Sequence, residues 1–414
     1  MQQGVVAEAR GARGARLLWL ALLALFLSYV DRGLLPVAGP AISDSFDLSA
    51  TQFGLAVSAF FWVYAPFQYV SGWLVDRHRL YRQYAGGVAL WGLGTGAIAL
   101  VTGLGGLVAA RLLKGLGQAV TFPAMSKFIL RHGEPHWQAR WNGAMIAAIA
   151  LGQALSALAG GLLIAGLGWQ AAFVVAGAVT LLWLWPWHRA TAGLAEPVAA
   201  VVAGPRVSYR AIVGTRALWS ASAGHFSGNY VLYFVIAWLP LFLVRERGLS
   251  TSEMAVLAGG IFCAQAVGAL LAGQVADRFV VGRADESWRR KALMIGIYLS
   301  CAAALVVAGT AASMPVIALA LVLTAATVGA GGALLYAISQ CFAGPAAAGR
   351  WVGVQNGTAN FSGIVGPVIT GMLVDATGNY SAAFMLAALL AVAAALCWSV
   401  LLPAIRPIEW ARQP

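Results

Sequence analysis

Two short groups of charged or amide residues lie inside long apolar stretches of this chain, where a charged side chain more often serves chemistry than packing. Asp31 and Arg32 are neighbours in one stretch, and Arg111, Lys114 and Gln118 share another. A charge at the centre of a membrane costs at least about 2.5 to 3.5 kcal/mol. We therefore interpret Asp31 as a proton-binding carboxylate and Arg32 as an anion-binding guanidinium.

The Asp31–Arg32 pair need not form a salt bridge. Adjacent residues on a helix point about 100° apart, so one side chain can face a ligand while the other faces a neighbouring helix. The alternative is a helix-end pair near the membrane interface, because Gly33 and Pro36 could end the regular helix there.

The second group has helical spacing. Arg111 and Lys114 are three residues apart, and Lys114 and Gln118 four apart, which predicts a polar stripe on one helix face, pointing into a bundle or cavity. For Arg111 an alternative stays open, in which it holds helices together or extends to an interface.

Other polar residues in apolar stretches are candidates for ligand contacts. His225 titrates in the physiological range and is a second candidate proton site, although a lone histidine is also common as a hydrogen-bonded interior residue. Hydroxyl and amide groups suit a polyol or a carboxylate, or join helices to one another. Those we expect to bind substrate are Tyr29, Tyr64, Asn229, Tyr230, Tyr336, Asn356 and Asn360.

The elements that must position these residues are membrane-spanning helices. Of the 414 residues, 61% are hydrophobic and 10% are charged, too few charges for an ordinary soluble domain. Apolar stretches of about 20 residues recur along the chain. They predict an all-α membrane protein with 12 helices, at 17–39, 51–75, 84–103, 106–130, 139–166, 169–188, 216–244, 252–276, 290–311, 314–341, 350–375 and 379–403.

Basic residues collect in alternate loops between these stretches. The positive-inside tendency then places both termini in the cytoplasm. We expect an N-terminal tail at 1–16, a six-helix bundle at 17–188, a cytoplasmic linker at 189–215, a second six-helix bundle at 216–403 and a tail at 404–414.

A repeat supports two related halves. GWLVDR (72–77) closes the second predicted helix, and GQVADR (273–278) closes the eighth, 201 residues later. Transporters built from repeats place the substrate path between two such halves. We expect a cytoplasmic gate at these turns, although ordinary helix-end pairing is the alternative. Its residues are Gly72, Asp76, Arg77, Asp277 and Arg278.

Composition argues against several other classes. The net charge of +12 is spread over short loops rather than one patch, so no nucleic-acid partner is expected. The four cysteines and five histidines lack the clustering of a metal site, and we expect neither metal nor cofactor. A membrane-embedded enzyme or a non-transporting receptor is disfavoured, because an enzyme needs a nucleophile and base or grouped metal ligands.

Several stretches resemble one transporter family. The segments SYVDRGLLPVAGPAISDSFDLSATQFGLAVSAFFWVYAPFQYVSGWLVDRHRLYR, RLLKGLGQAVTFPA, NYVLYFVIAWLPLFLVRERGLS and GVQNGTANFSGIVGPVITG are similar to helices 1 and 2, 4, 7 and 11 of the anion:cation symporter family of the major facilitator superfamily. The resemblance covers nearly the whole chain. It implies proton- or cation-linked transport of organic anions such as sugar acids or hexuronates, by rocking of two six-helix halves.

The resemblance also implies roles for single residues. It makes Asp31 the proton site, Arg32 the carboxylate clamp, and Tyr29, Tyr64, Tyr336 and Asn356 the matching polar positions. One departure concerns Gln118, which stands where the family usually has a glutamate. Since glutamine does not titrate, a coupling scheme with two carboxylates is in doubt for this chain.

The sequence thus predicts a secondary active transporter rather than an enzyme. We expect a monomer in a bacterial inner membrane that moves a small organic anion together with protons, with sodium as the other candidate ion. In one hypothesis, ionised Asp31 competes with the anion for Arg32. The alternative function is a drug or metabolite exporter of the same fold, which should have a larger and more apolar cavity.

Overall fold

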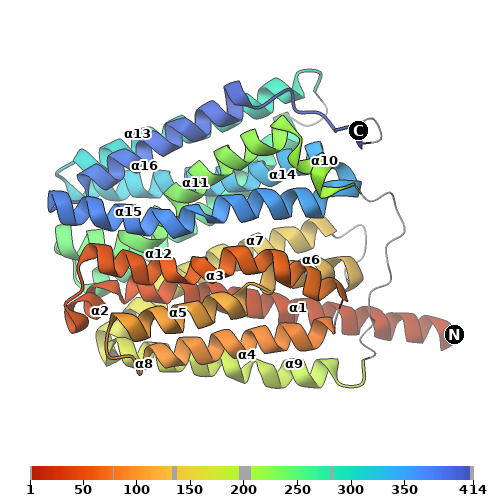
Figure 1. The fold of residues 1–414 in the computed structure, drawn as a ribbon, viewed down its shortest axis with the longest axis horizontal. Coiled ribbons are helices and arrows are strands. Elements are labelled where there is room, and N and C mark those ends of the chain that lie inside the picture. Colours follow the sequence, from red (N-terminus) through yellow and green to blue (C-terminus); the bar gives the residue numbers. More distant parts are fainter. Residues whose placement is uncertain (1, 78, 133–137, 195–206, 280–282, 411–414) are drawn as a thin grey trace. The chain divides into compact units, whose positions relative to one another are not determined.

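The computed structural model describes residues 2–77, 79–132, 138–194, 207–279 and 283–410, and in these residues the chain is all-α, as predicted. Figure 1 shows the helices in chain order. They are α1 (Gln2–Val37), α2 (Gly39–Phe46), α3 (Ala50–Arg77), α4 (Leu80–Ile98), α5 (Leu104–Gln118), α6 (Thr121–His132), α7 (Gln138–Leu155), α8 (Gly161–Leu182), α9 (Leu184–Thr191), α10 (Tyr209–Val213), α11 (Arg216–Leu241), α12 (Thr251–Phe279), α13 (Glu286–Thr310), α14 (Met314–Asn360), α15 (Ser362–Thr377) and α16 (Ser381–Leu396).

The number of membrane spans is shown only in part. Within the described residues, 8 helices are long and apolar enough to cross a membrane, or 9 if α2 and the bent start of α3 form one span. One of the eight, Ala147–Thr191, contains Gly168 at φ 84°, a break between the predicted fifth and sixth spans. Helices α4 to α6 occupy the third and fourth predicted spans but are shorter or more polar. The count of 12 therefore stays a prediction.

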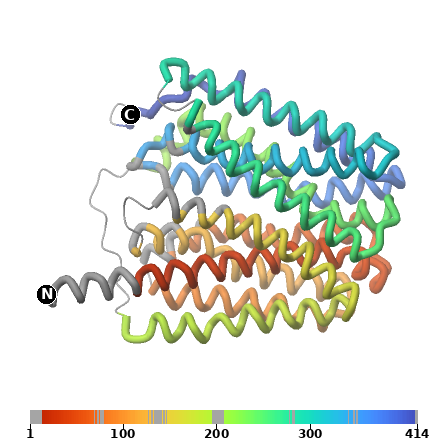
Figure 2. Tube along the Cα trace, turned by 180° about the vertical axis from the view of Figure 1, so that it is seen from behind, coloured from red at the N-terminus to blue at the C-terminus, as the bar shows by residue number. Residues whose placement is uncertain are grey.

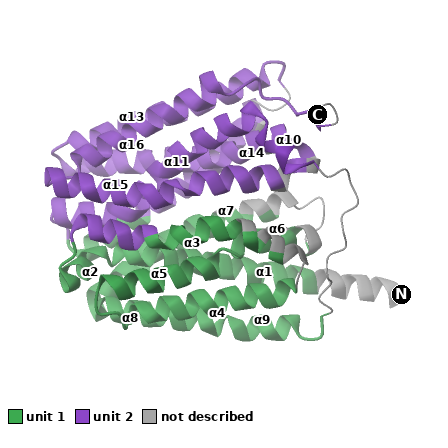
Figure 3. Cartoon of the chain, viewed as in Figure 1, with its two compact units in different colours: residues 1–48, 59–201, 250–259 green, residues 49–58, 202–249, 260–414 purple. Residues whose placement is uncertain are grey.

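The chain divides into two compact units (Figure 3). Unit 1 comprises residues 1–48, 59–201 and 250–259, and unit 2 comprises 49–58, 202–249 and 260–414. The start of α3 (49–58) belongs to unit 2 while the rest of α3 belongs to unit 1, and the start of α12 (250–259) belongs to unit 1 while the rest of α12 belongs to unit 2. These two segments begin 201 residues apart. This offset equals that of the sequence repeat. The predicted bundles at 17–188 and 216–403 differ from these units at the starts of α3 and α12. The bundle limits remain a proposal.

Aromatic rings form much of the core of unit 1. Helix α4 packs against both α5 and α8, which Figures 1 and 2 show from opposite sides. The ring of Tyr84 contacts Phe128 at 5.1 Å and Trp187 at 5.3 Å between centroids. Its hydroxyl donates a hydrogen bond of 2.9 Å to the carbonyl of Ala21 in α1. These contacts fix α4 against α1, and α4 in turn carries part of the candidate site.

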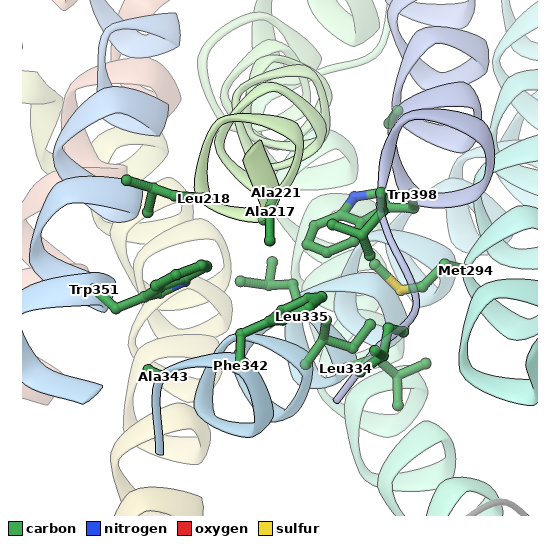
Figure 4. Packing of buried hydrophobic residues seen from close by; sticks show 14 of the residues in the cluster. Ala217, Leu218, Ala221, Met294, Leu334, Leu335, Phe342, Ala343, Trp351 and Trp398 are labelled. Carbon is green, nitrogen blue, oxygen red and sulfur yellow. The ribbon is translucent and has the colours of Figure 1, made fainter. Parts of the chain in front are cut away.

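The core of unit 2 joins α11, α14 and the end of the last helix. Figure 4 shows Leu218, Phe342, Trp351 and Trp398 as members of one cluster of buried residues. The rings of Phe342 and Trp351 stack with centroids 5.8 Å apart. Between these two residues, Gly344 has a φ of 60°, a conformation that favours glycine, and it breaks the regular course of α14.

Candidate functional site

The guanidinium of Arg32 is held inside unit 1 by three aromatic rings and one amide. Its Cζ atom lies 4.6 Å from the ring centroid of Tyr29, 4.6 Å from that of Phe60 and 4.7 Å from that of Tyr64. Its Nη2 donates a 3.1 Å hydrogen bond to Oε1 of Gln118. Aromatic faces attract a cation without neutralising it. The site therefore presents a positive charge in a rigid setting.

Gln118 is fixed at both ends of its amide. While Oε1 accepts from Arg32, Nε2 donates to the carbonyl of Ser28 at 3.2 Å, so α5 is bonded twice to α1. The amide orients the guanidinium but brings no charge to it. A glutamate at this position would form an ion pair with Arg32. The departure from the family pattern thus leaves more of the positive charge for a ligand.

The carboxylate of Asp31 lies in different surroundings from Arg32. Its Oδ2 accepts hydrogen bonds from Thr95 of α4 at 3.0 Å and from Thr180 of α8 at 3.3 Å. The side chain is 1% exposed. The hypothesis that ionised Asp31 competes directly for Arg32 is therefore not supported in this conformation, because the carboxylate bonds to neighbouring helices instead.

Lys114 is the cation that accompanies Asp31. Its Nζ donates a 3.0 Å hydrogen bond to the backbone carbonyl of Asp31, and its charge acts on the Asp31 carboxylate. Lys114 is 0% exposed. An isolated ammonium is costly in such a place, so each charge lowers the cost of burying the other.

The residues of the predicted polar stripe lie on a buried face of α5. Arg111, Lys114 and Gln118 are all buried. Arg111 does not extend to an interface, since its Cζ lies 5.0 Å from the ring centroid of Phe60. Helix α1 continues past Gly33 and ends at Val37, one residue after Pro36, so Asp31 and Arg32 lie within its last two turns and the helix-end alternative stays open.

Two glycines allow α5 to approach its neighbours. A Cβ atom on Gly115 would lie 2.3 Å from the carbonyl oxygen of Phe60 in α3. One on Gly117 would lie 2.6 Å from the backbone nitrogen of Trp91 in α4. Only glycine permits both contacts, so these positions let α5 pack closely against α3 and α4.

In unit 2 the structure connects four of the predicted residues. His225 shares a side-chain hydrogen bond with Asn229 on the same helix. Its ring also meets that of Tyr336 edge to face, with centroids 5.8 Å apart. The Tyr336 hydroxyl then donates to Oδ1 of Asn356 at 3.4 Å. These contacts make His225 part of an interior hydrogen-bonded network, and its role as a proton site stays a prediction.

The network continues to Asn360, whose Nδ2 donates to the backbone carbonyl of Asn356 at 2.9 Å. Oδ1 of Asn360 accepts a 2.6 Å hydrogen bond from Tyr233. Tyr230 points elsewhere, since its hydroxyl lies 3.4 Å from that of Thr370. Among the predicted substrate-binding residues of unit 2, Tyr230 is thus the one whose described partner, Thr370, lies outside this network.

The predicted gate is described only in part. The exposure of Gly72 and the side chains of Asp76, Arg77 and Asp277 lie outside what the structure describes. Arg278 is exposed, with its Cζ 5.7 Å from the ring centroid of Phe279. The gate therefore remains a prediction. As to metals, no group of three or more histidine, cysteine or acidic residues suited to one occurs in the part of the chain described here.

Known proteins similar to this chain are membrane transporters. A model of the Major Facilitator Superfamily matches residues 21–284 and 264–414. The hexuronate transporter of Bacillus subtilis is 30% identical over 403 residues, which is 93% of each chain. A probable sulfoacetate transporter of Cupriavidus necator is 28% identical and covers 90% of each chain. A probable galactarate/D-glucarate transporter of Escherichia coli is 25% identical, over 96% of this chain and 97% of its own.

Among solved structures, a bacterial homologue of the human lysosomal transporter Spinster, inward-facing and occupied, has a TM-score of 0.75. The two sequences are 20% identical, over 92% of this chain and 95% of the other. This likeness concerns the fold.

Proposed function

Because the chain belongs to the Major Facilitator Superfamily, we propose that it carries a small organic anion, such as a hexuronate or another sugar acid, across a membrane by alternating access. The observation that carries the proposal is the buried guanidinium of Arg32, bonded to an uncharged amide. The relatives support it, since hexuronate, sulfoacetate and the two aldarates in their names are all organic anions.

In this proposal Arg32 binds the carboxylate of the substrate. A guanidinium presents paired N–H donors that match the two oxygens of a carboxylate. Tyr29 and Tyr64 hold the guanidinium from the side and supply hydroxyl groups. The candidate groups for the hydroxyls of a sugar acid are those expected from the sequence, namely Asn229, Tyr230, Tyr336, Asn356 and Asn360.

Coupling to protons acts through Lys114 rather than through direct contact between Asp31 and Arg32. When Asp31 takes up a proton, the negative charge beside Lys114 disappears, and the positive charge of Lys114, Arg32 and Arg111 is no longer offset. The anion then binds more tightly. By linkage, the anion raises the proton affinity by the same factor, which gives symport. Sodium is the alternative coupling ion, with Asp31 as its ligand.

Export of cationic drugs is the second candidate function. An exporter of cations favours embedded acidic residues, because they attract its cargo. Among the described residues of unit 1, three cations are buried, Arg32, Arg111 and Lys114, but only one carboxylate, that of Asp31. This balance favours an anionic cargo.

The first test is the thermal stability of the purified protein with sugar acids, aromatic acids, dicarboxylates, sulfoacetate and cationic drugs. A compound that binds only the folded state stabilises that state by about 2.7 kcal/mol when its concentration is 100 times its Kd. The melting temperature therefore rises. We expect one class of carboxylate or sulfonate to stabilise the protein. Stabilisation by bulky cations alone would instead favour the exporter.

The variant Gln118→Glu tests the role of the uncharged amide. We expect an ion pair with Arg32 that weakens anion binding at about pH 8 by at least about tenfold, since close charge pairs couple strongly. The loss should shrink as the pH falls and the new carboxyl takes up a proton. Gln118→Met, which removes the amide without adding charge, is the control and should show no added pH dependence. Equal pH profiles for both variants would contradict this role.

We further propose that the chain acts as a monomer in a bacterial inner membrane with both termini in the cytoplasm. The alternation of basic loops along the sequence supports the orientation of the termini, and the bacterial relatives support a bacterial membrane.

A further inference from the structure

A cavity of about 780 Å³ lies in unit 1 between the start of α4 and the end of α9, away from Arg32 and Asp31. We call it the α4/α9 cavity. Its lining includes Arg79, Arg82, His188, Tyr81 and Trp187, and none of the residues that line it is acidic. The transport proposal assigns no role to this cavity.

The base of the α4/α9 cavity is rigid and its rim is cationic. Trp187 donates a hydrogen bond from its Nε1 to the backbone carbonyl of Tyr81 at 3.1 Å, and the Tyr81 hydroxyl lies 2.9 Å from Nε2 of His132. Arg79 and Arg82 are exposed. A lining that combines fixed aromatic side chains with two exposed arginines suits a phosphate ester, whose oxygens accept charge-assisted hydrogen bonds.

The surroundings of the cavity are those of a membrane interface. Leu182 and Trp185, just before and within α9, are 71% and 63% exposed. The guanidinium of Arg189 lies over the Trp185 ring, 4.1 Å from its centroid. Exposed tryptophan next to arginine is typical of the headgroup region, and the positive-inside tendency assigns this end to the cytoplasmic leaflet.

We propose that the α4/α9 cavity binds the phosphate headgroup of an anionic phospholipid such as phosphatidylglycerol. Arg79 and Arg82 bind the phosphate, while the exposed apolar side chains of Leu182 and Trp185 lie against the acyl chains. Basic pockets between helices on the cytoplasmic side recognise anionic headgroups in this way.

The test measures binding of phosphatidylglycerol to the full chain in detergent, by native mass spectrometry and by the melting temperature. The Arg79→Ala/Arg82→Ala double variant should bind phosphatidylglycerol about 30-fold more weakly than the wild type, since each cation near a headgroup contributes roughly fivefold. Both residues are exposed, so the variant should fold. The matched control is Arg283→Ala, an exposed arginine in the loop before α13, which should bind the lipid as the wild type does.

Two further probes separate the sources of a phosphate group. Phosphatidylcholine, which carries no net charge, should bind weakly and equally to all variants. Equal binding of phosphatidylcholine and phosphatidylglycerol, or unchanged binding in the double variant, would overturn the proposal. Glycerol phosphate alone should not stabilise the protein; if it does so while the lipid does not, the cavity binds a soluble phosphate compound and the lipid assignment is wrong.

Discussion

Arg32→Ala is expected to weaken binding of the transported anion by about 30-fold to several thousand-fold. Truncating one partner of a buried charge pair costs about 2 to 5 kcal/mol, and each 1.4 kcal/mol is tenfold in affinity. The guanidinium is buried among Tyr29, Phe60 and Tyr64, so water replaces it poorly. Isothermal titration with the best ligand from the stability panel measures the change directly.

Two variants control for charge and for stability. Arg32→Lys keeps the charge but loses the planar fork and the ring contacts, and it should bind with intermediate affinity. Arg247→Ala removes another arginine that lies over a ring, that of Phe242 at 5.1 Å, in unit 2. It should leave binding unchanged. If Arg32→Ala folds, as its melting temperature will report, and binds as tightly as the wild type, the anion site lies elsewhere.

The residue types alone mark the charged residues of the candidate site, because buried charges are expensive and therefore rare. No structure is needed to recognise Asp31, Arg32 and Lys114, because they are charged residues within apolar stretches. Helical spacing then placed Lys114 and Gln118 on one face, and the structure confirms that both are buried. The identity of the charged groups and their shared helix face were thus readable from residue types and spacing.

The partners of these charges were not predictable in the same way. Thr95 and Thr180, which hold Asp31, and Phe60, which covers Arg32, are residue types that occur throughout membrane helices. No spacing rule marks them, because they come from α4, α8 and α3 and meet only in the folded unit. For the same reason the sequence allowed Asp31 and Arg32 to interact, while the structure directs them to different neighbours.

The count of spans shows a related limit. Hydropathy finds helices that face lipid, but α5 carries its charges on a buried face and is short in the structure, at 15 residues. The polarity that makes this region a candidate site thus also lowers its mean hydropathy as a membrane span.

The proposed coupling predicts a non-additive pair of variants. Asp31→Asn leaves Lys114 buried beside a neutral side chain, and Lys114→Met leaves Asp31 buried without its cation. Breaking a buried pair from one side costs about 3 to 5 kcal/mol, whereas removing both charges is often nearly neutral. The double variant should therefore be more stable to heat than either single variant. Additive losses in melting temperature would show that the two charges do not interact.

The same variants separate binding from coupling in transport. In vesicles, Asp31→Asn and the double variant should still exchange internal for external anion, because Arg32 remains. Neither should accumulate the anion when the outside is made acidic, since no carboxyl is left to carry the proton. Accumulation by Asp31→Asn at the wild-type level would refute the proton role of Asp31. Wild-type accumulation that follows a sodium gradient and ignores pH would make sodium the coupling ion, so the charge pair would serve a metal cation rather than a proton.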